Sequence, residues 1–368
     1  MPTPDLPTTQ ISDSVEQLWG LALQVAGCRQ CGQAFLVEAS RMGQPCPNCA
    51  SGKLESQPAR LSSQPPELVV PFVKMQADVR AALENFVKGV WLAPDDFNTE
   101  ALLRRAVAVF WPMWLIDGTV VGIWQAEAGF DYQVKSSQES YSGSAWRSRE
   151  VIETRQRWEP RTGQIVRHYD NVCVPAASDH ARLVRLVGDY HYDKAAAYDK
   201  ARVTRSVMRL PDLPPQGAWP QAQVGLDHAA EQECLKASAA QHIRNYSVKA
   251  DYESLNWTQM LLPLVASYYT DDDGVNHPVY INGQSGMIGG VRMASQRKGW
   301  RWAGILAGIA IVLLLLGLLL SALGVILVGG FLIFVAILVG MAALVPAVWP
   351  WQWNRRQAPE KIVRSQTP

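Results

Sequence analysis

Four of the six cysteines form two closely spaced pairs near the start of the 368-residue chain. Cys28 and Cys31 make the first pair, Cys46 and Cys49 make the second, and 14 residues separate the pairs. Two such pairs can place four thiolates at the corners of a tetrahedron around Zn²⁺, which leaves no open coordination position. Because no fifth ligand lies nearby, the pattern predicts a structural zinc site that stabilises a small zinc ribbon over residues 28–54.

Cys173 and Cys234 lie outside these pairs and follow different patterns. Cys173 alternates with apolar neighbours as in a strand, whereas Cys234 lies in a helical pattern. A cysteine without a reactive setting packs as a small apolar side chain. We therefore expect both residues to be buried rather than redox-active.

The sequence motifs of several enzyme classes are incomplete in this chain. Gly52 and Lys53 are followed by Leu54, so no phosphate-binding loop of a helicase forms there. Residues 283–286 resemble a nucleophile elbow, but Met287 stands where the closing glycine belongs. The six histidines are scattered, and none is paired with a local serine or cysteine. We therefore predict no catalytic residues and no enzyme activity.

Two polar loops near the end of the soluble region could hold a ligand. Asp271, Asp272 and Asp273 resemble the start of a calcium loop, but Asn282 stands where the bidentate glutamate belongs. We therefore expect a solvated hairpin turn there. Residues 282–286 could cup an anion or a peptide backbone with their amides, or form a tight glycine turn after the last strand, and both interpretations stay open.

Residues 303–349 contain no charged side chain, and Ser321 carries their only hydroxyl. A membrane-spanning helix needs about 20 apolar residues, so this stretch is long enough for two spans and a short turn. Gly304 and Gly308 have the spacing of a helix–helix contact. Together with Gly317 on the first helix and Gly329, Gly330 and Gly340 on the second, they fit two spans that face each other, and flexibility near a turn is the other interpretation. One long span followed by a re-entrant segment is the alternative.

Basic residues flank the apolar stretch on both sides, whereas the predicted turn, about residues 321–330, carries no charge. Lys and Arg close to a span favour the cytoplasmic side, so we expect both ends of the hairpin there. Residues 1–20 contain no Lys or Arg and thus lack the basic start of a signal peptide. The N-terminus, the soluble core and the C-terminus are therefore expected in the cytoplasm. The flanking basic residues are Arg292, Arg297, Lys298, Arg301, Arg355, Arg356, Lys361 and Arg364.

Composition and periodicity divide the chain into six ranges. A segment rich in Ser, Gln and Pro predicts a linker after the ribbon. The predicted ranges are an N-terminal tail (1–27) with a short helix over 11–26, the zinc ribbon (28–54), the linker (55–66), a soluble α+β core (67–296), a transmembrane helical hairpin (303–349) and a basic tail (350–368).

Within the core, the apolar pattern alternates between helical and strand periods. Helices are expected over 73–90, 98–105, 179–187 and 220–245. Asn98 is the expected N-cap of the helix over 98–105. Three hairpins are expected, namely 106–116 with 119–132, 146–158 with 165–174, and 257–270 with 279–282. The core is therefore predicted to be α+β with mostly antiparallel strands. Similar proline-containing strands at 110–118 and 261–269 could mark a duplicated helix–hairpin unit.

Several short motifs, together with the ribbon cysteines, are shared with a known group of proteins. They lie at residues 70–72, 91–94, 110–117, 261–263 and 280–286. On these motifs the chain resembles a family of bacterial membrane proteins with an N-terminal transcription-factor-IIB-type (TFIIB-type) zinc ribbon, a soluble core and C-terminal transmembrane helices. Members often carry a primosomal-helicase-like label because of the ribbon, and similar proteins are associated with envelope-stress scaffolds. The resemblance implies an integral protein of the bacterial inner membrane and brings no catalytic residue.

The charge balance bears on the class of partner. The chain has 34 basic and 33 acidic residues, a net charge of +1, and so offers little to neutralise phosphates. We interpret it as a non-enzymatic, membrane-anchored adaptor or scaffold that recruits cytoplasmic protein partners, with a role in envelope stress implied by the resemblance. A membrane-tethered nucleic-acid-binding protein is the alternative. The lipid bilayer is the other expected partner, self-association stays open, and no small-molecule substrate is expected.

Overall fold

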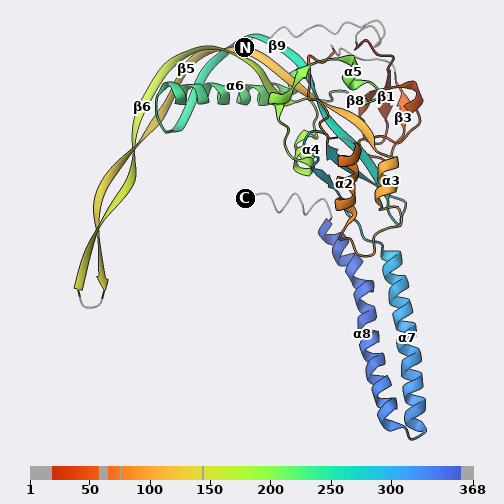
Figure 1. The fold of residues 1–368 in the computed structure, drawn as a ribbon. Coiled ribbons are helices and arrows are strands. Elements are labelled where there is room, and N and C mark those ends of the chain that lie inside the picture. The colour runs from red at the N-terminus through yellow and green to blue at the C-terminus, as the bar shows by residue number, and fades with distance from the viewer. Residues whose placement is uncertain (1–18, 58–64, 75, 143–144, 358–368) are drawn as a thin grey trace. The chain divides into compact units, whose positions relative to one another are not determined.

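The computed structural model describes residues 19–57, 65–74, 76–142 and 145–357 (Figure 1). The chain divides into two compact units. The hairpin unit takes its described residues from Met113–Ser178 and Pro211–Met260. The ribbon unit takes them from Ile11–Pro112, Asp179–Leu210 and Leu261–Pro368.

The predicted α+β class is confirmed, with a four-cysteine cluster near the N-terminus, a large and mostly antiparallel sheet, and two apolar C-terminal helices. The strand order is β11-β10-β9-β5-β8-β2-β1-β3, and β8 pairs parallel with β5. The duplicated helix–hairpin unit stays a prediction. The strands are β1 (Gln24–Cys28), β2 (Ala34–Val37), β3 (Leu54–Ser56), β4 (Leu68–Val69), β5 (Val107–Ser142), β6 (Ala145–Pro175), β7 (Ala196–Ala197), β8 (Val207–Arg209), β9 (His242–Thr270), β10 (Asn276–Asn282) and β11 (Ile288–Gly290).

All four predicted core helices are present, with shifted ends. Asn98 is the predicted N-cap, because its Oδ1 accepts a hydrogen bond from the backbone N–H of Ala101 at 2.9 Å. The helix predicted over 220–245 begins earlier and ends at Ala237, and residues 242–245 belong to β9 instead. The helices are α2 (Gln76–Val87), α3 (Thr99–Arg104), α4 (His180–Val187), α5 (Lys200–Val203), α6 (Pro215–Ala237), α7 (Gln296–Ala322) and α8 (Ile326–Gln357), with short 3₁₀ turns η1 (Ala39–Arg41) and η2 (Tyr192–Lys194).

The first two predicted hairpins are wrong. β5 and β6 form a single long hairpin, with antiparallel pairing from Met113 opposite Pro175 to Ser142 opposite Ala145. The expected turn at 117–118 is instead an irregularity in the strand, where the register shifts between Ile116 and Gly118.

Asp117 and Gly118 suit this irregularity for physical reasons. Asp117 Oδ1 accepts a hydrogen bond from the backbone N–H of Asn171 at 2.8 Å, which satisfies a donor that the shifted ladder leaves free. A Cβ at Gly118 would lie only 2.7 Å from Leu255 Cδ2 in β9. The glycine therefore permits a close approach of strands, and its presence does not mark a chain reversal.

Pro160 and Gly163, which stand between the two strands expected for the second hairpin (146–158 and 165–174), lie within β6. In the part of the chain that the structure describes, β6 pairs only with β5, so it is an edge strand, where a proline is tolerated. A Cβ at Gly163 would lie 2.9 Å from Trp124 Nε1, so the glycine makes room for that indole. The third predicted hairpin is confirmed, because β9 and β10 pair antiparallel around the acidic turn at 271–274.

Helix α6 packs on the hairpin unit's sheet through a stripe of residues spaced four apart. Small side chains in this stripe let the helix approach closely. Cys234 belongs to the stripe and is buried, as predicted, whereas Cys173 in β6 is half-buried, and burial raises its pKa to about 11. The stripe consists of Ala218, Ala222, Leu226, Ala230 and Cys234, and it covers Ile116, Val120, Ile165 and Val174.

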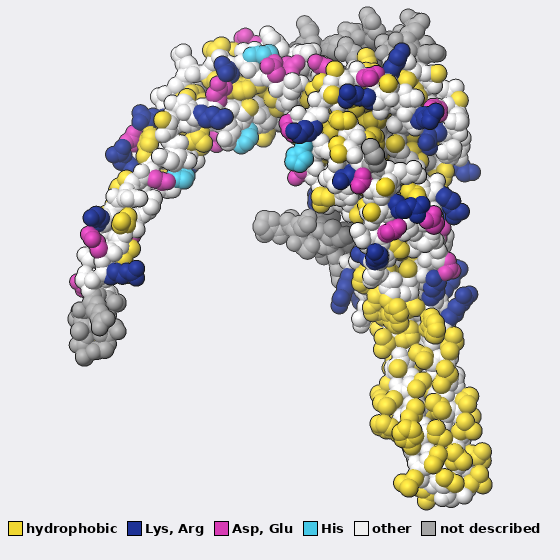
Figure 2. Space-filling model, in the orientation of Figure 1, with side chains coloured by type: hydrophobic (Ala, Val, Ile, Leu, Met, Phe, Trp, Pro, Cys, Tyr) yellow, Lys and Arg dark blue, Asp and Glu magenta, His cyan; other side chains and the backbone are white. Residues whose placement is uncertain are grey.

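In the ribbon unit, the two C-terminal helices are each long and apolar enough to cross a membrane, by length and composition. Apolar side chains cover α7 and α8, and Lys and Arg gather where the helices join the rest of the unit (Figure 2). Leu323–Val325 connects the helices, with Gly324 in the left-handed region at φ +86°.

The prediction of glycines at the contact between the two helices is wrong for Gly304 and Gly308. A Cβ at either residue would meet nothing within 4 Å. The close approach uses Gly317 and Gly329, as expected, together with Gly299: a Cβ at Gly317 would lie 2.8 Å from Ile333 Cγ1, and one at Gly299 would lie 2.9 Å from Pro350 Cγ. Backbone contact through these glycines holds α7 against α8.

Parts of three predicted ranges lie outside the described residues. These parts are residues 11–18 of the expected N-terminal helix, residues 58–64 of the linker and residues 358–368 of the basic tail. The described end of the expected helix differs from the prediction, because Gln24–Cys28 form the strand β1.

Candidate metal centre

Two tight turns bring the four predicted cysteines together. Cys28 ends β1, and the N–H of Gly32 donates to its carbonyl at 2.8 Å, closing a turn around Cys31. Gly32 has φ +72°, a backbone conformation that glycine adopts without steric cost. In the second turn, the N–H of Ala50 donates to the carbonyl of Cys46 at 2.8 Å and closes the loop around Cys49.

The sulfur atoms converge on one point. All four Sγ atoms lie within 4.8 Å of one another, and the Cys28–Cys49 and Cys31–Cys46 Sγ pairs are each 3.7 Å apart. A disulfide would require about 2.0 Å, so the thiols are free. Among the described residues, no other group of three or more His, Cys, Asp or Glu side chains is arranged to hold a metal ion. The cluster is therefore a metal-binding site.

Backbone donors surround the sulfurs. The N–H of Asn48 donates to Cys46 Sγ at 3.4 Å, and that of Gly52 donates to Cys49 Sγ at 3.5 Å. Hydrogen bonds from Cys31 and Cys46 hold the pKa of the Cys49 thiol well below its usual range, and the bond to Cys31 raises that of Cys46. The cluster thus favours one thiolate even before a cation displaces the remaining protons.

Gly52 keeps the centre of the cluster clear. A Cβ at this position would overlap Cys28 Sγ and would lie 2.9 Å from Gln30 Cβ. In the sequence, Gly52 stands out only as part of an incomplete phosphate-loop motif. Its role follows from packing that the spacing of the cysteines does not reveal.

The ribbon strands next to the metal centre join the sheet of the core. β2 pairs antiparallel with β8, and the N–H of Leu210 donates to the carbonyl of Ala34 at 2.9 Å. Ribbon and core side chains share one hydrophobic cluster, which includes Leu36, Phe110 and Met208. The ribbon is therefore packed on the core and continuous with its sheet.

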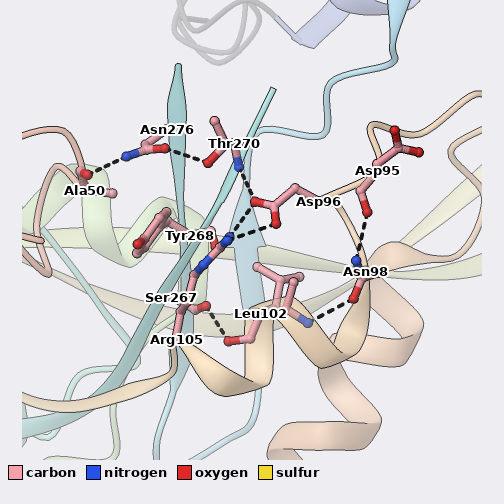
Figure 3. A network of polar contacts seen from close by, with 11 residues as sticks. Ala50, Asp95, Asp96, Asn98, Leu102, Arg105, Ser267, Tyr268, Thr270 and Asn276 are labelled. Carbon is pink, nitrogen blue, oxygen red and sulfur yellow. Dashed lines mark hydrogen bonds and ion pairs between the residues drawn. The ribbon is translucent and has the colours of Figure 1, made fainter. Parts of the chain in front are cut away.

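The second cysteine turn is also held by polar contacts, several of which are drawn in Figure 3. Asn276 Nδ2 donates to the carbonyl of Ala50 at 2.8 Å, and the Tyr280 hydroxyl donates to that of Asn48. Thr270 Oγ1 donates to Asn276 Oδ1 at 2.8 Å and extends the network toward β9. The turn that carries Cys46 and Cys49 is thus fixed to β10.

The same network continues to the Asp96–Arg105 ion pair (Figure 3). Asp96 accepts from the N–H of Thr270 at 2.8 Å and from both terminal nitrogens of Arg105, at 2.5 and 2.9 Å. The Arg105 guanidinium holds the pKa of this carboxyl below its usual range, against the opposing effect of burial. Next to it, Asp95 pairs with Lys298 of α7, Oδ1 to Nζ 2.6 Å.

The acidic turn after β9 is only partly the solvated tip that we predicted. Asp271 accepts from two N–H groups of its own turn and pairs with His277, Oδ2 to Nε2 2.8 Å. Asp272 Oδ2 accepts from Ser295 Oγ at 2.8 Å and from the N–H of Arg297 at 3.0 Å. A carboxylate there offsets the positive end of the α7 dipole, so this turn caps the first apolar helix.

The loop at 282–286 is a tight turn that is filled by its own side chains. Asn282 Oδ1 accepts from the N–H groups of Gln284 and Ser285 at 2.9 and 3.0 Å. Gln284 exchanges hydrogen bonds with the backbone of His191, and Gly286 has φ +80°. These donors are committed within the fold, which favours the glycine-turn interpretation over an anion cup.

One buried charge was not anticipated from the sequence. The Arg209 side chain is fully buried on β8, with Nη1 2.8 Å from Asp179 Oδ1 and its guanidinium 3.9 Å above the Trp111 ring. Burial of an arginine requires such partners, and the three residues are far apart in the sequence. No local pattern could have brought them together.

Comparison with known proteins adds no identity. No protein-family model, no curated protein and no solved structure matches the chain. The function is therefore inferred from the geometry of the chain itself.

Proposed function

We propose that this chain is a non-enzymatic adaptor of the bacterial inner membrane, in which a zinc ribbon and its core recruit cytoplasmic protein partners. The observation that carries the proposal is the construction of the ribbon unit. Its cysteine cluster, its sheet and its two apolar helices belong to one compact unit. A partner bound to such a unit is held at the membrane.

Zinc is the metal that suits the cluster best. Zn–S bonds of about 2.3 Å place the sulfurs of a tetrahedral site about 3.8 Å apart. Two of the Sγ pairs are 3.7 Å apart, and all lie within 4.8 Å. Four thiolates leave no position for water or substrate, so a zinc ion here stabilises the two turns and activates nothing.

The helices α7 and α8 suit a membrane anchor. Among their described residues from 303 to 349 there is no ionisable side chain that could serve a proton or ion path, so anchoring fits them better than transport. Asn354 near the end of α8 makes two hydrogen bonds to the backbone of Ala294, just before α7, at 2.8 and 3.0 Å. Both ends of the helical hairpin are thereby tied together beside the core.

An open strand edge supports the recruitment of protein partners. In the described residues β6 pairs only with β5, so the outer edge of a 31-residue strand carries unpaired backbone donors and acceptors. Such an edge can add a strand from a partner. Ile152 and Val166 on β6 are both more than half exposed and add apolar contact area.

The experiment is a pull-down of the tagged full-length chain from bacterial membranes solubilised in mild detergent. We expect specific protein partners with the wild-type chain. The matched control is the double variant Cys46→Ser, Cys49→Ser, which keeps both apolar helices but loses half of the metal ligands. If the wild-type chain returns no specific partner, the adaptor function is wrong.

A membrane-tethered nucleic-acid-binding protein is the second candidate. Arg29 and Arg41 of the ribbon favour it, although Arg29 is paired with Glu55, Nε to Oε2 2.6 Å. This function predicts salt-sensitive retardation of duplex or single-stranded DNA by the full chain in lipid nanodiscs. Absence of retardation at low salt removes this candidate.

A further inference from the structure

A hollow of about 330 Å³ lies in the ribbon unit between the second cysteine turn and the core. One wall is formed by ribbon residues that include Arg41 and Cys46, and the other by the end of α3, the start of β5, and residues of β8 and β9. Its volume is at the lower end of the range of about 300–1,000 Å³ for ligand pockets. The hollow can therefore take a few side chains of a peptide but no folded domain.

All the charged side chains that line the hollow are positive. Three arginines, Arg41, Arg104 and Arg105, line the hollow, and no carboxylate does. Arg105 is neutralised by Asp96, with its guanidinium 4.8 Å from the centre of the Tyr268 ring. Arg41 contacts the uncharged Gln44, Nη1 to Oε1 3.4 Å, and the Arg104 side chain at the end of α3 is exposed. Two positive charges are thus available to a ligand.

The rest of the lining is largely apolar. Val107, Val207 and Ala266 contribute from three strands of the core, and Pro47 contributes from the cysteine turn. Arginines beside an apolar surface suit a ligand that carries carboxylates next to an apolar group, because the guanidinium fork pairs with carboxylate oxygens. The chemistry of the hollow therefore matches a short acidic peptide with an apolar side chain.

The hollow is formed before a ligand arrives. The contacts of Ala50 with Asn276 and of Asn48 with Tyr280 fix the ribbon wall to β10. Within the ribbon unit, the ribbon strands lie at the end away from the free turn of α7 and α8 (Figure 1). That placement favours a protein segment over a lipid headgroup as the source of the carboxylates.

We propose that this hollow binds a short acidic segment of a protein partner, with its carboxylates on Arg41 and Arg104 and an apolar side chain against Val107, Val207 and Tyr268. The inference rests on the proposed adaptor function and names the kind of segment that the adaptor recognises. Because the ribbon wall contains Cys46, formation of the hollow is tied to the metal centre.

The test measures fluorescence anisotropy with the full chain in lipid nanodiscs. The probe is a fluorescein-labelled peptide with two glutamates flanking a leucine, and its twin carries glutamines instead. We expect the acidic probe to bind at least tenfold more tightly than its twin. The double variant Arg41→Glu, Arg104→Glu should weaken its binding by about tenfold for each arginine lost.

The control variant is Arg185→Glu with Arg202→Glu, which makes the same charge change at two exposed residues outside the hollow. It should leave binding of the acidic probe unchanged. Equal binding of the two peptides, no binding of the acidic probe, or an equal loss in the control variant would overturn the inference. Displacement of the probe by inorganic phosphate alone at millimolar concentration would also overturn it, because the hollow would then be a phosphate site.

Failure of this test is distinguishable from failure of the adaptor function. A wild-type pull-down with partners, combined with no acidic-peptide binding, leaves the adaptor intact and places its recognition surface elsewhere. An empty pull-down removes the adaptor function itself, whatever the peptide does.

Discussion

At the scale of single residues, the metal centre depends on a glycine as much as on its cysteines. Gly52 has no functional group, yet any side chain there would enter the space of Cys28 Sγ. The N–H of the same residue donates to Cys49 Sγ. One residue thus clears room for the first cysteine pair and supports a thiolate of the second.

Gly52→Ala should therefore weaken metal binding without removing a ligand. We expect the affinity for Zn²⁺ to fall by about 10- to 100-fold, the range seen for residues that orient metal ligands. Competition with a chromophoric chelator measures this affinity. Ser51→Ala, which removes only an exposed hydroxyl bonded to the carbonyl of Cys49, is the control. Equal affinity in the glycine variant and the wild type would contradict the assigned role.

Asp96 stabilises the contact between β9 and the loop that precedes α3. Its folded-state pKa lies below the ordinary value of 3.8, so its contribution is complete above pH 3.8 and is lost as the pH falls through the folded-state pKa. Asp96→Asn should lower the free energy of unfolding by about 1–3 kcal/mol at pH 7. The difference between variant and wild type should shrink in acid.

Urea unfolding in detergent micelles, followed by tryptophan fluorescence at neutral and acid pH, measures this difference. Asp95→Asn is the matched control, because the Asp95 side chain is 92% exposed and solvent screens its pair with Lys298, so the pair contributes little to stability. The account is contradicted if both variants lose the same stability, or if the effect of Asp96→Asn is the same in acid.

At the scale of elements, a few glycines determine the contact between α7 and α8. Only the glycines that face the other helix contribute to it. A Cβ at Gly329 would overlap Ser321 Oγ in the facing helix, whereas one at Gly304 would meet nothing. Gly329→Leu should therefore push the helices apart, and Gly304→Leu should not. The readout is the disulfide formed between Ala310→Cys and Gly340→Cys, because a Cβ at Gly340 would lie 3.9 Å from Ala310 Cβ.

We expect Gly329→Leu to reduce the yield of this cross-link by roughly half or more, since close backbone approach drives association of such helices. Gly304→Leu should give the yield of the parent protein. A reversed order of the two variants would show that the helices pack through the GxxxG face that the sequence suggested.

The sequence predicted elements well where a local pattern determines them. Cysteine spacing located the metal centre, Asn98 marked the start of α3, and the acidic turn located the β9–β10 hairpin. It failed where glycine and proline serve a neighbouring strand or side chain. Gly118 and Gly163 make room for Leu255 and Trp124, and Pro160 lies on a strand edge, so none of them reverses the chain.

Packing of the ribbon on the core was equally out of reach of sequence patterns. The pairing of β2 with β8 joins residues about 170 positions apart, namely Phe35 with Arg209 and Leu36 with Met208. Neither β8, with three residues, nor the buried pair of Arg209 and Asp179 has a periodicity that indicates its partner. Such contacts follow from the tertiary fold, which local propensity does not determine.

At the scale of the whole molecule, the proposed membrane anchor predicts on which side of the membrane the two termini lie. Basic residues at both ends of the helical hairpin predict that both termini lie in the cytoplasm. Green fluorescent protein fused to either end should therefore fluoresce, and alkaline phosphatase fused to either end should be inactive. A phosphatase-active fusion at the C-terminus would indicate one span with a re-entrant segment, or the opposite orientation.

The claim on which the account depends most is that the four thiolates hold one zinc ion. The direct measurement is elemental analysis of the full chain purified in detergent without added metal. We predict about one Zn per chain for the wild type and little or none for the double variant Cys46→Ser, Cys49→Ser. A wild-type chain that is folded but free of zinc, or a double variant with undiminished zinc content, would contradict the account.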